Sequence, residues 1–190
     1  HGSVNGPITR LVSPSDVGEM IKPFVFLDAF DTNPVPPRDI GFHPHSGIAT
    51  VSVLFQGKFR FEETSGTEGV LGAGSVEWMR ASRGVWHAGT SFGEERVQGY
   101  QLWIALPPEL ENAEVEAYYL SAENVAADGP ARVLIGQYGN ASSIIPAPAG
   151  LNYLDVQLKA GEQWNYQPPA GHTVCWLAIQ KGQLRAPGEV

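Results

Sequence analysis

The sequence has little of three features that mark particular classes of protein. It has a single cysteine, Cys175, so no intramolecular disulfide can form and a reducing, cytoplasmic compartment is expected. No apolar run reaches about 18 residues, the length a membrane-spanning helix needs, so no span is expected. Only 12 Lys and Arg face 20 Asp and Glu, and the basic residues are scattered. Direct binding of nucleic acid is therefore not expected, because it requires a basic face.

The sequence does contain the material for a globular core with many turns. Hydrophobic residues make up 43% of the 190 residues, while 22 glycines and 15 prolines leave little room for long helices. Cys175 lies within the apolar stretch 173–179, so we expect a small buried side chain and not a reactive thiol.

Short runs with β-branched and aromatic residues recur along the chain, separated by turns. The alternation predicts a hairpin of 47–55 and 58–63 through Gln56-Gly57, and Pro107-Pro108 ends the last strand of this set. The stretch from 108 to 123 is predicted to be mostly linker with a helical turn. Many short strands at this spacing indicate an all-β sandwich or barrel. Further strands of this set are predicted at 70–71, 75–79 and 99–106.

A second set of strands repeats this order on a smaller scale. Strands are predicted at 132–135, 151–158 and 172–179, and they are too few to close a barrel before Val190. We therefore expect an N-terminal domain over 4–125 and an apparently incomplete second unit over 126–190. The second unit is either truncated, packed incompletely on the first, or part of a longer chain.

Two histidines form the most informative local pattern, His43-Pro44-His45. Residues i and i+2 of an extended chain point the same way, so both imidazoles are expected on one face. If the pleat continues unbroken, that face also carries residues 51, 53 and 55, and the imidazoles would look into an apolar cavity.

His87, about forty residues further on, is a candidate third ligand. A barrel of short hairpins can bring this distant segment over the His43 and His45 pair, with open positions left for water, substrate or oxygen. The plainer alternative is that these histidines have a structural role, and the spacing alone does not decide between the two.

Linked motifs lie at 26–30, 43–47, 50–57, 72–79, 82–87, 101–107, 153–158 and 169–172. In order and spacing, those up to residue 107 resemble the pirin family of the cupin superfamily, and the last two resemble the second cupin domain of that family. The resemblance implies a bicupin fold of cupin-type double-stranded β-helix (jelly-roll) barrels, with a mononuclear metal site, usually iron, in the first. It also implies one of two roles, quercetin 2,3-dioxygenase or an iron-dependent partner of transcription proteins.

The resemblance also implies a ligand set that this chain only partly retains. His43, His45 and His87 match the family's three histidines, but Gly89 stands where the family has a glutamate. The general cupin pattern places another glutamate where this chain has Ala49. Three neutral ligands leave the charge of a divalent ion uncompensated, which is expected to weaken retention and to favour Fe(II), although another divalent first-row metal would also suit the site.

The missing glutamate also removes a plausible base for deprotonating a flavonol hydroxyl. Glu77, Glu94 and Glu95 are candidate substitutes for the missing carboxylate, although exposed solvated carboxylates are the commoner case.

Four further residues are candidates for lining a pocket. Phe55, Trp78 and Trp103 offer surfaces for a flat aromatic ligand, with membership of the core as the alternative. Gln101 is polar within a strand and would orient a ligand or satisfy backbone groups. His172, in the second unit, lacks a His-x-His partner and is interpreted as structural.

Three functional hypotheses follow from these residues. The first is a metal-dependent dioxygenase that acts on a small aromatic, flavonol-like substrate. The second is a non-catalytic regulator whose metal state changes the surface offered to a protein partner, which suits the net charge of −8. The third is a degenerate cupin without metal. The missing glutamate favours the second and third hypotheses over the first.

Overall fold

Antiparallel strands form nearly all of the regular structure in this computed structural model, which describes residues 3–33 and 35–187. The larger sheet has the spatial order β1 (Ser3–Asn5), β2 (Ile8–Val12), β3 (Phe24–Thr32), β10 (Val97–Ala105), β5 (Ile48–Gln56), β8 (Val76–Arg80), β11 (Glu116–Leu120). The second sheet has the order β4 (Asp39–His45), β9 (Val85–Phe92), β6 (Lys58–Glu63), β7 (Glu68–Gly72). Within the described residues, the helical turns are α1 (Pro108–Glu111), η1 (Val17–Glu19) and η2 (Ala122–Asn124).

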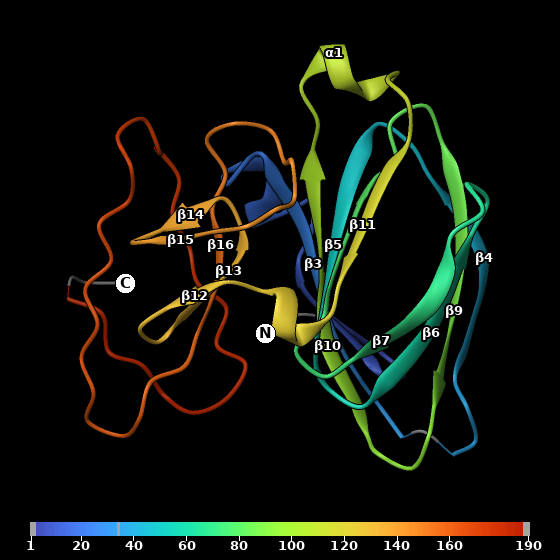
Figure 1. The fold of residues 1–190 in the computed structure, drawn as a ribbon, viewed down its shortest axis with the longest axis horizontal. Helices are drawn as coiled ribbons and strands as arrows, with labels where there is room; N and C mark the ends of the chain where they lie inside the picture. The colour runs from blue at the N-terminus through green and yellow to red at the C-terminus, as the bar shows by residue number, and fades with distance from the viewer. Residues whose placement is uncertain (1–2, 34, 188–190) are drawn as a thin grey trace.

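These two sheets face each other and enclose the interior of the first unit (Figure 1). The predicted all-β fold is confirmed, and the helical turn expected after Pro107 is α1. The segment after α1, expected as linker, instead contains β11, which pairs with β8 and extends the larger sheet. No helix in the described ranges is long and apolar enough to cross a membrane.

The predicted hairpin of 47–55 and 58–63 is wrong in its pairing, although both strands exist. β5 pairs with β10 and β8 in the larger sheet, whereas β6 pairs with β7 and β9 in the smaller one. Gly57, with a φ of 80°, carries the chain from one sheet to the other. Alternation within each strand was visible in the sequence, but it does not specify which strands become neighbours.

β5 and β8 of the larger sheet are buried on both of their faces. Thr50 and Ser52 of β5 point into the space between the two sheets, whereas Val51 and Val53 point away from it. The outward-pointing apolar residues pack against the second unit, where Leu134 and Ile135 join the same core. The sheet is therefore a shared wall, with the interior of the first unit on one side and the second unit on the other.

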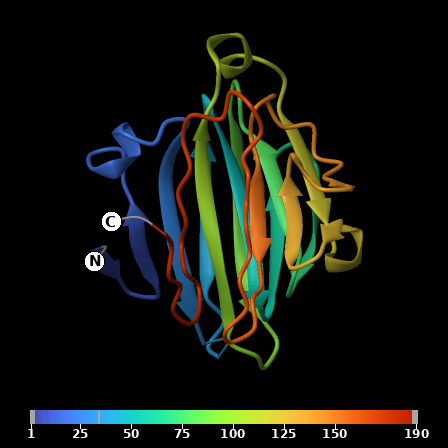
Figure 2. The ribbon, with the colours of Figure 1, turned by 90° about the vertical axis from the view of Figure 1, so that its left-hand side faces the viewer.

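The second unit contains two small sheets and a long irregular segment. The predicted strands at 132–135 and 151–158 correspond to β13 and β16, but 172–179 forms no strand. The chain after residue 157 runs over the outer face of the larger sheet (Figure 2), where Trp176 contacts Phe24 at a ring separation of 5.8 Å. The division into domains at residue 125 stays a prediction. The sheets are formed by β12 (Ala127–Asp128), β13 (Ala131–Ile135) and β16 (Tyr153–Val156), and by β14 (Gln137–Tyr138) and β15 (Ala141–Ser142).

Cys175 is exposed, so the expectation of a buried side chain is wrong. The segment around it is extended without strand partners, and alternate residues point to opposite sides. Trp176 takes the side that faces the larger sheet, which leaves Cys175 on the side toward solvent. His172 is half-buried in the same unit, and its structural role stays a prediction.

Candidate metal centre

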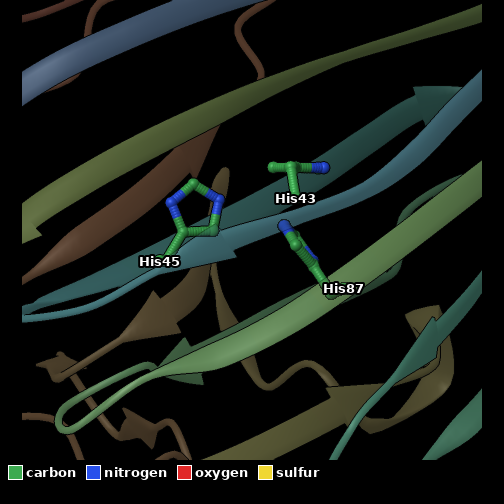
Figure 3. A group of neighbouring side chains, drawn as sticks. All are labelled: His43, His45 and His87. Atoms are coloured by element: carbon green, nitrogen blue, oxygen red, sulfur yellow. The ribbon is translucent and has the colours of Figure 1, made fainter.

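Three histidines lie together on the inner face of the four-stranded sheet. His43 and His45 leave β4 on the same side, and β9 places His87 directly opposite His43. Their ligand nitrogens all lie within 4.8 Å of one another, and the ring centroids are 4.4 Å to 5.2 Å apart (Figure 3). The fold thus brings the three predicted side chains together from two neighbouring strands. Their role as ligands stays a prediction.

The continuous pleat expected from His43 to residue 55 is interrupted at Gly47. This glycine has a φ of 70°, a backbone conformation that side chains with a Cβ rarely adopt. The turn moves the chain from β4 in the smaller sheet to β5 in the larger one. As a result, Val51, Val53 and Phe55 do not share the face of the imidazoles, which corrects the expected apolar lining.

The hydrogen bonds of the imidazoles leave the Nε2 atoms free to bind a metal. Nδ1 of His43 lies 2.9 Å from the carbonyl oxygen of Gly41, so Nδ1 carries the proton and Nε2 keeps its lone pair. The Nε2 atoms of His45 and His87 are buried and have no hydrogen-bond partner. Buried polar atoms are rarely left without a partner, and a ligand nitrogen that awaits a metal explains these two. The residues present therefore fit a divalent metal ion.

The surroundings keep two of the imidazoles neutral. Burial, followed by the charge of His43, lowers the pKa of His45 to about 4. Burial, followed by the charges of His43 and His45, lowers the pKa of His87 to about 3. Neutral imidazole is the form that binds a metal, so neither group has to lose a proton before binding at neutral pH.

A phenyl ring fills the position from which a side chain at residue 89 would start. A Cβ added to Gly89 would lie 2.5 Å from Cζ of Phe59 and closer still to Cε1. Ala49, at the general cupin position, is buried on the opposite face of β5, away from the imidazoles. Neither position provides a carboxylate, and at residue 89 the ring also excludes one.

The three candidate substitutes for this carboxylate differ sharply in position. Glu94 and Glu95 are exposed in the turn between β9 and β10. Glu77, on β8, is 5% exposed, and its Oε1 lies 3.9 Å from Nδ1 of His87. That separation is too long for a hydrogen bond but short for two groups that can carry opposite charges. Glu77 stands outside the group of mutually close ligand atoms, so it lies behind His87 and not among the ligands.

Sequence reasoning missed a second buried carboxylate, Glu63. It lies directly opposite His87 in the pairing of β6 with β9, and its Oε1 accepts a hydrogen bond of 2.9 Å from the Tyr119 hydroxyl. Burial raises the pKa of Glu77 to about 7. Hydrogen bonding from Ser52 opposes this rise, and the charge of Glu63 adds to it. The strict alternation of 58–63 places Glu63 on the inner face and was the available signal.

Two of the four pocket candidates line the interior beside the imidazoles. Trp103 lies edge-on to His45 at a ring separation of 5.0 Å and stacks on Phe26 at 4.0 Å. Its Nε1 donates a hydrogen bond of 3.1 Å to Oε1 of Gln101, whose Nε2 lies 3.4 Å from Oγ of Ser52. Gln101 thus holds the indole in place, and Trp103 presents a half-buried aromatic wall next to His45.

The other two candidates point the other way, which corrects their expected place. Trp78 lies opposite Val51 in the pairing of β8 with β5, and both belong to the core shared with the second unit. Phe55 packs edge-on against Tyr100 at 5.1 Å, on that same face. The alternative considered from the sequence, membership of the core, describes both residues.

Comparison with known proteins identifies the family. The profile of the family described as Pirin matches residues 7–104, just over half of the chain. The chain belongs to the pirin family. A Pseudomonas aeruginosa protein with the provisional name quercetin 2,3-dioxygenase is 31% identical in an alignment of length 201, gaps included. The alignment covers 97% of this chain and 69% of that protein. A pirin-like protein of Caulobacter vibrioides is 31% identical over 188 residues, which cover 94% and 67%.

Solved structures place the architecture among the cupins of the pirin type. A crystal structure of quercetin 2,3-dioxygenase from Acinetobacter baumannii matches with a TM-score of 0.69 at 25% identity, over 77% of this chain and 57% of that one. A bacterial pirin from Escherichia coli, solved in complex with nickel(II), matches with a TM-score of 0.53 at 19% identity, which shows the shared fold alone. The chain spans little more than half the length of these two solved proteins.

Proposed function

We propose that this pirin-family protein is a metal-dependent oxygenase that acts on a small aromatic, flavonol-like substrate. His43, His45 and His87 would hold the ion. The observation that carries the proposal is the convergence of one ring nitrogen from each histidine, together with the buried Nε2 atoms of His45 and His87, which have no hydrogen-bond partner. The quercetin dioxygenase names among its relatives support the substrate class. Three neutral ligands leave the ionic charge uncompensated, which favours Fe(II) over Fe(III).

The side chains of this site divide the work between metal and substrate. When bound, the ion would polarise substrate oxygens beside O₂. Trp103, held by Gln101 and backed by Phe26, offers a flat apolar surface against which an aromatic ring can stack. His43 is half-buried and lies toward solvent, so the substrate would enter from its side. In this proposal residues 4–125 form the catalytic domain and 126–190 buttress its outer wall.

A second candidate function is favoured by the absence of a carboxylate at residue 89. Without that base, the metal state would serve as a signal to a protein partner in a reducing, cytoplasmic compartment, and the net charge of −8 suits a protein more than DNA.

The deciding experiment is anaerobic loading with Fe(II), elemental analysis, and then oxygen uptake with quercetin. The oxygenase proposal expects about one iron per chain and substrate-dependent uptake, and His87→Ala should lose both. Full iron loading with no uptake would refute the flavonol oxygenase and leave the regulatory function. A protein that retains no metal after loading would refute both and identify a degenerate cupin.

A further inference from the structure

The candidate metal centre has no carboxylate among its ligands, and residue 89, where the family has a glutamate, is a glycine. The Phe59 ring occupies the space that a side chain at Gly89 would need. A divalent ion held by three neutral imidazoles in a poorly solvated interior is costly unless negative charge lies nearby. Two buried carboxylates, Glu63 and Glu77, lie beside His87.

One carboxylate faces the non-ligating nitrogen of a proposed ligand. Glu77 projects from β8 in the larger sheet toward β9 in the smaller one, and its Oε1 lies 3.9 Å from Nδ1 of His87. His87 has Nε2 buried without a partner, so its two ring nitrogens have different surroundings: one is free for an ion and the other faces a carboxylate. A carboxylate behind a ligating histidine fixes the tautomer and raises the basicity of the ligand nitrogen.

Glu77 has a hydroxyl-bearing residue opposite it on each neighbouring strand. It lies opposite Ser52 in the pairing of β5 with β8 and opposite Tyr119 in the pairing of β8 with β11, and the Tyr119 hydroxyl donates a hydrogen bond to Glu63. Ser52 in turn accepts from Gln101, which fixes Trp103 beside His45. Polar side chains thus follow one another across the interior from His87 to the aromatic wall next to His45. A buried carboxylate needs polar neighbours, and Oε1 of Glu77 faces the imidazole of His87.

We propose that Glu77 is a positioning residue that orients His87 and supplies the negative charge of the metal centre from behind the imidazole, in place of the carboxylate missing at Gly89. The inference rests on the proposed metal centre. Direct ligation by Glu77 does not describe the arrangement, because the group of mutually close ligand atoms contains only the three histidines among the described residues. Glu77 acts on the ion through His87.

The test separates the charge of Glu77 from its shape, with Co(II) as a visible probe of binding. Glu77→Gln keeps the shape and removes the charge, and we expect the affinity for Co(II) to fall about 10- to 100-fold, the usual effect of losing such a partner. Glu77→Asp keeps the charge and alters the shape, and it should retain most of the affinity. Glu62→Gln is the matched control, because the carboxylate of Glu62 on β6 is exposed and points away from the interior. This variant should change the affinity less than twofold.

Two readouts besides the affinity make the outcome decisive. The thermal midpoint of each metal-free variant shows whether folding is preserved, and the visible spectrum of bound Co(II) should differ between Glu77→Gln and the wild type. Wild-type affinity in Glu77→Gln, or a larger loss in Glu77→Asp than in Glu77→Gln, would overturn the inference while leaving the metal centre intact. Failure of the wild-type protein itself to bind Co(II) would instead overturn the proposed function, and the inference with it.

Discussion

The packing of Phe59 over Gly89 makes a prediction whose sign runs against the general rule for glycine. Replacement of a strand glycine by alanine usually stabilises a protein by about 0.4–1 kcal/mol, because it restricts the unfolded chain. At Gly89 the added Cβ would lie 2.5 Å from Cζ of Phe59, so the ring must move. Overpacking of this kind costs about 1–3 kcal/mol, and Gly89→Ala is therefore expected to be destabilising.

The assays are urea unfolding and thermal unfolding of the metal-free protein at neutral pH. A net loss of about 1–2 kcal/mol would lower the thermal midpoint by about 2–8 °C in a chain of this size. Gly72→Ala is the matched control, since Gly72 lies in β7 and a Cβ there would meet nothing within 4 Å. That control is expected to be neutral or slightly stabilising.

A double-mutant cycle then assigns the cost to the ring itself. Phe59→Ala removes the obstruction, so the combined Phe59→Ala and Gly89→Ala changes should be less destabilising than the sum of the two by about 0.5–3 kcal/mol. A Gly89→Ala variant as stable as the Gly72→Ala control would refute the claim that Phe59 occupies this position. Gly89→Glu combined with Phe59→Ala should also bind a divalent metal more tightly than Phe59→Ala alone.

Three further predictions test other parts of the structure. The pKa values of His45 and His87 lie below the ordinary 6.5, so their contribution to stability is complete above pH 6.5 and is lost as the pH falls toward 4. The pKa of Glu77 is raised from 4.5 to about 7, so its contribution is complete below pH 4.5 and is lost as the pH rises through 7. Urea unfolding across this range should show Glu77→Gln gaining at most about 3 kcal/mol over the wild type at pH 8, and no gain would contradict the burial of that charge. Trp78→Ala should cost about 3–5 kcal/mol of stability, and calorimetry showing a negligible change would contradict its place in the core. Trp103→Ala should weaken flavonol binding measured by fluorescence while metal content stays unchanged, and unaltered binding would remove Trp103 from the substrate surface.

Local patterns in the sequence predicted the elements of this fold better than their partners. The alternation of 58–63 identified β6, and the apolar run 47–55 identified β5, because the side-chain period of a strand is a local property. Their pairing was mispredicted because both strands have the same pattern whether they are neighbours or lie in facing sheets. The turns at Gly47 and Gly57, which change sheets, decide that question.

The sequence by itself determined the all-β class, the placement of His43 and His45 on one side of a strand, and the absence of a glutamate at residue 89. Each follows from residues close together in the chain. The tertiary structure alone decided that His87 lies opposite His43, that Phe59 fills the space at Gly89, and that Glu77 stands behind His87. The first two relations join neighbouring strands of the smaller sheet and the third joins the two sheets, and only the folded pairing of distant segments sets the distances between them.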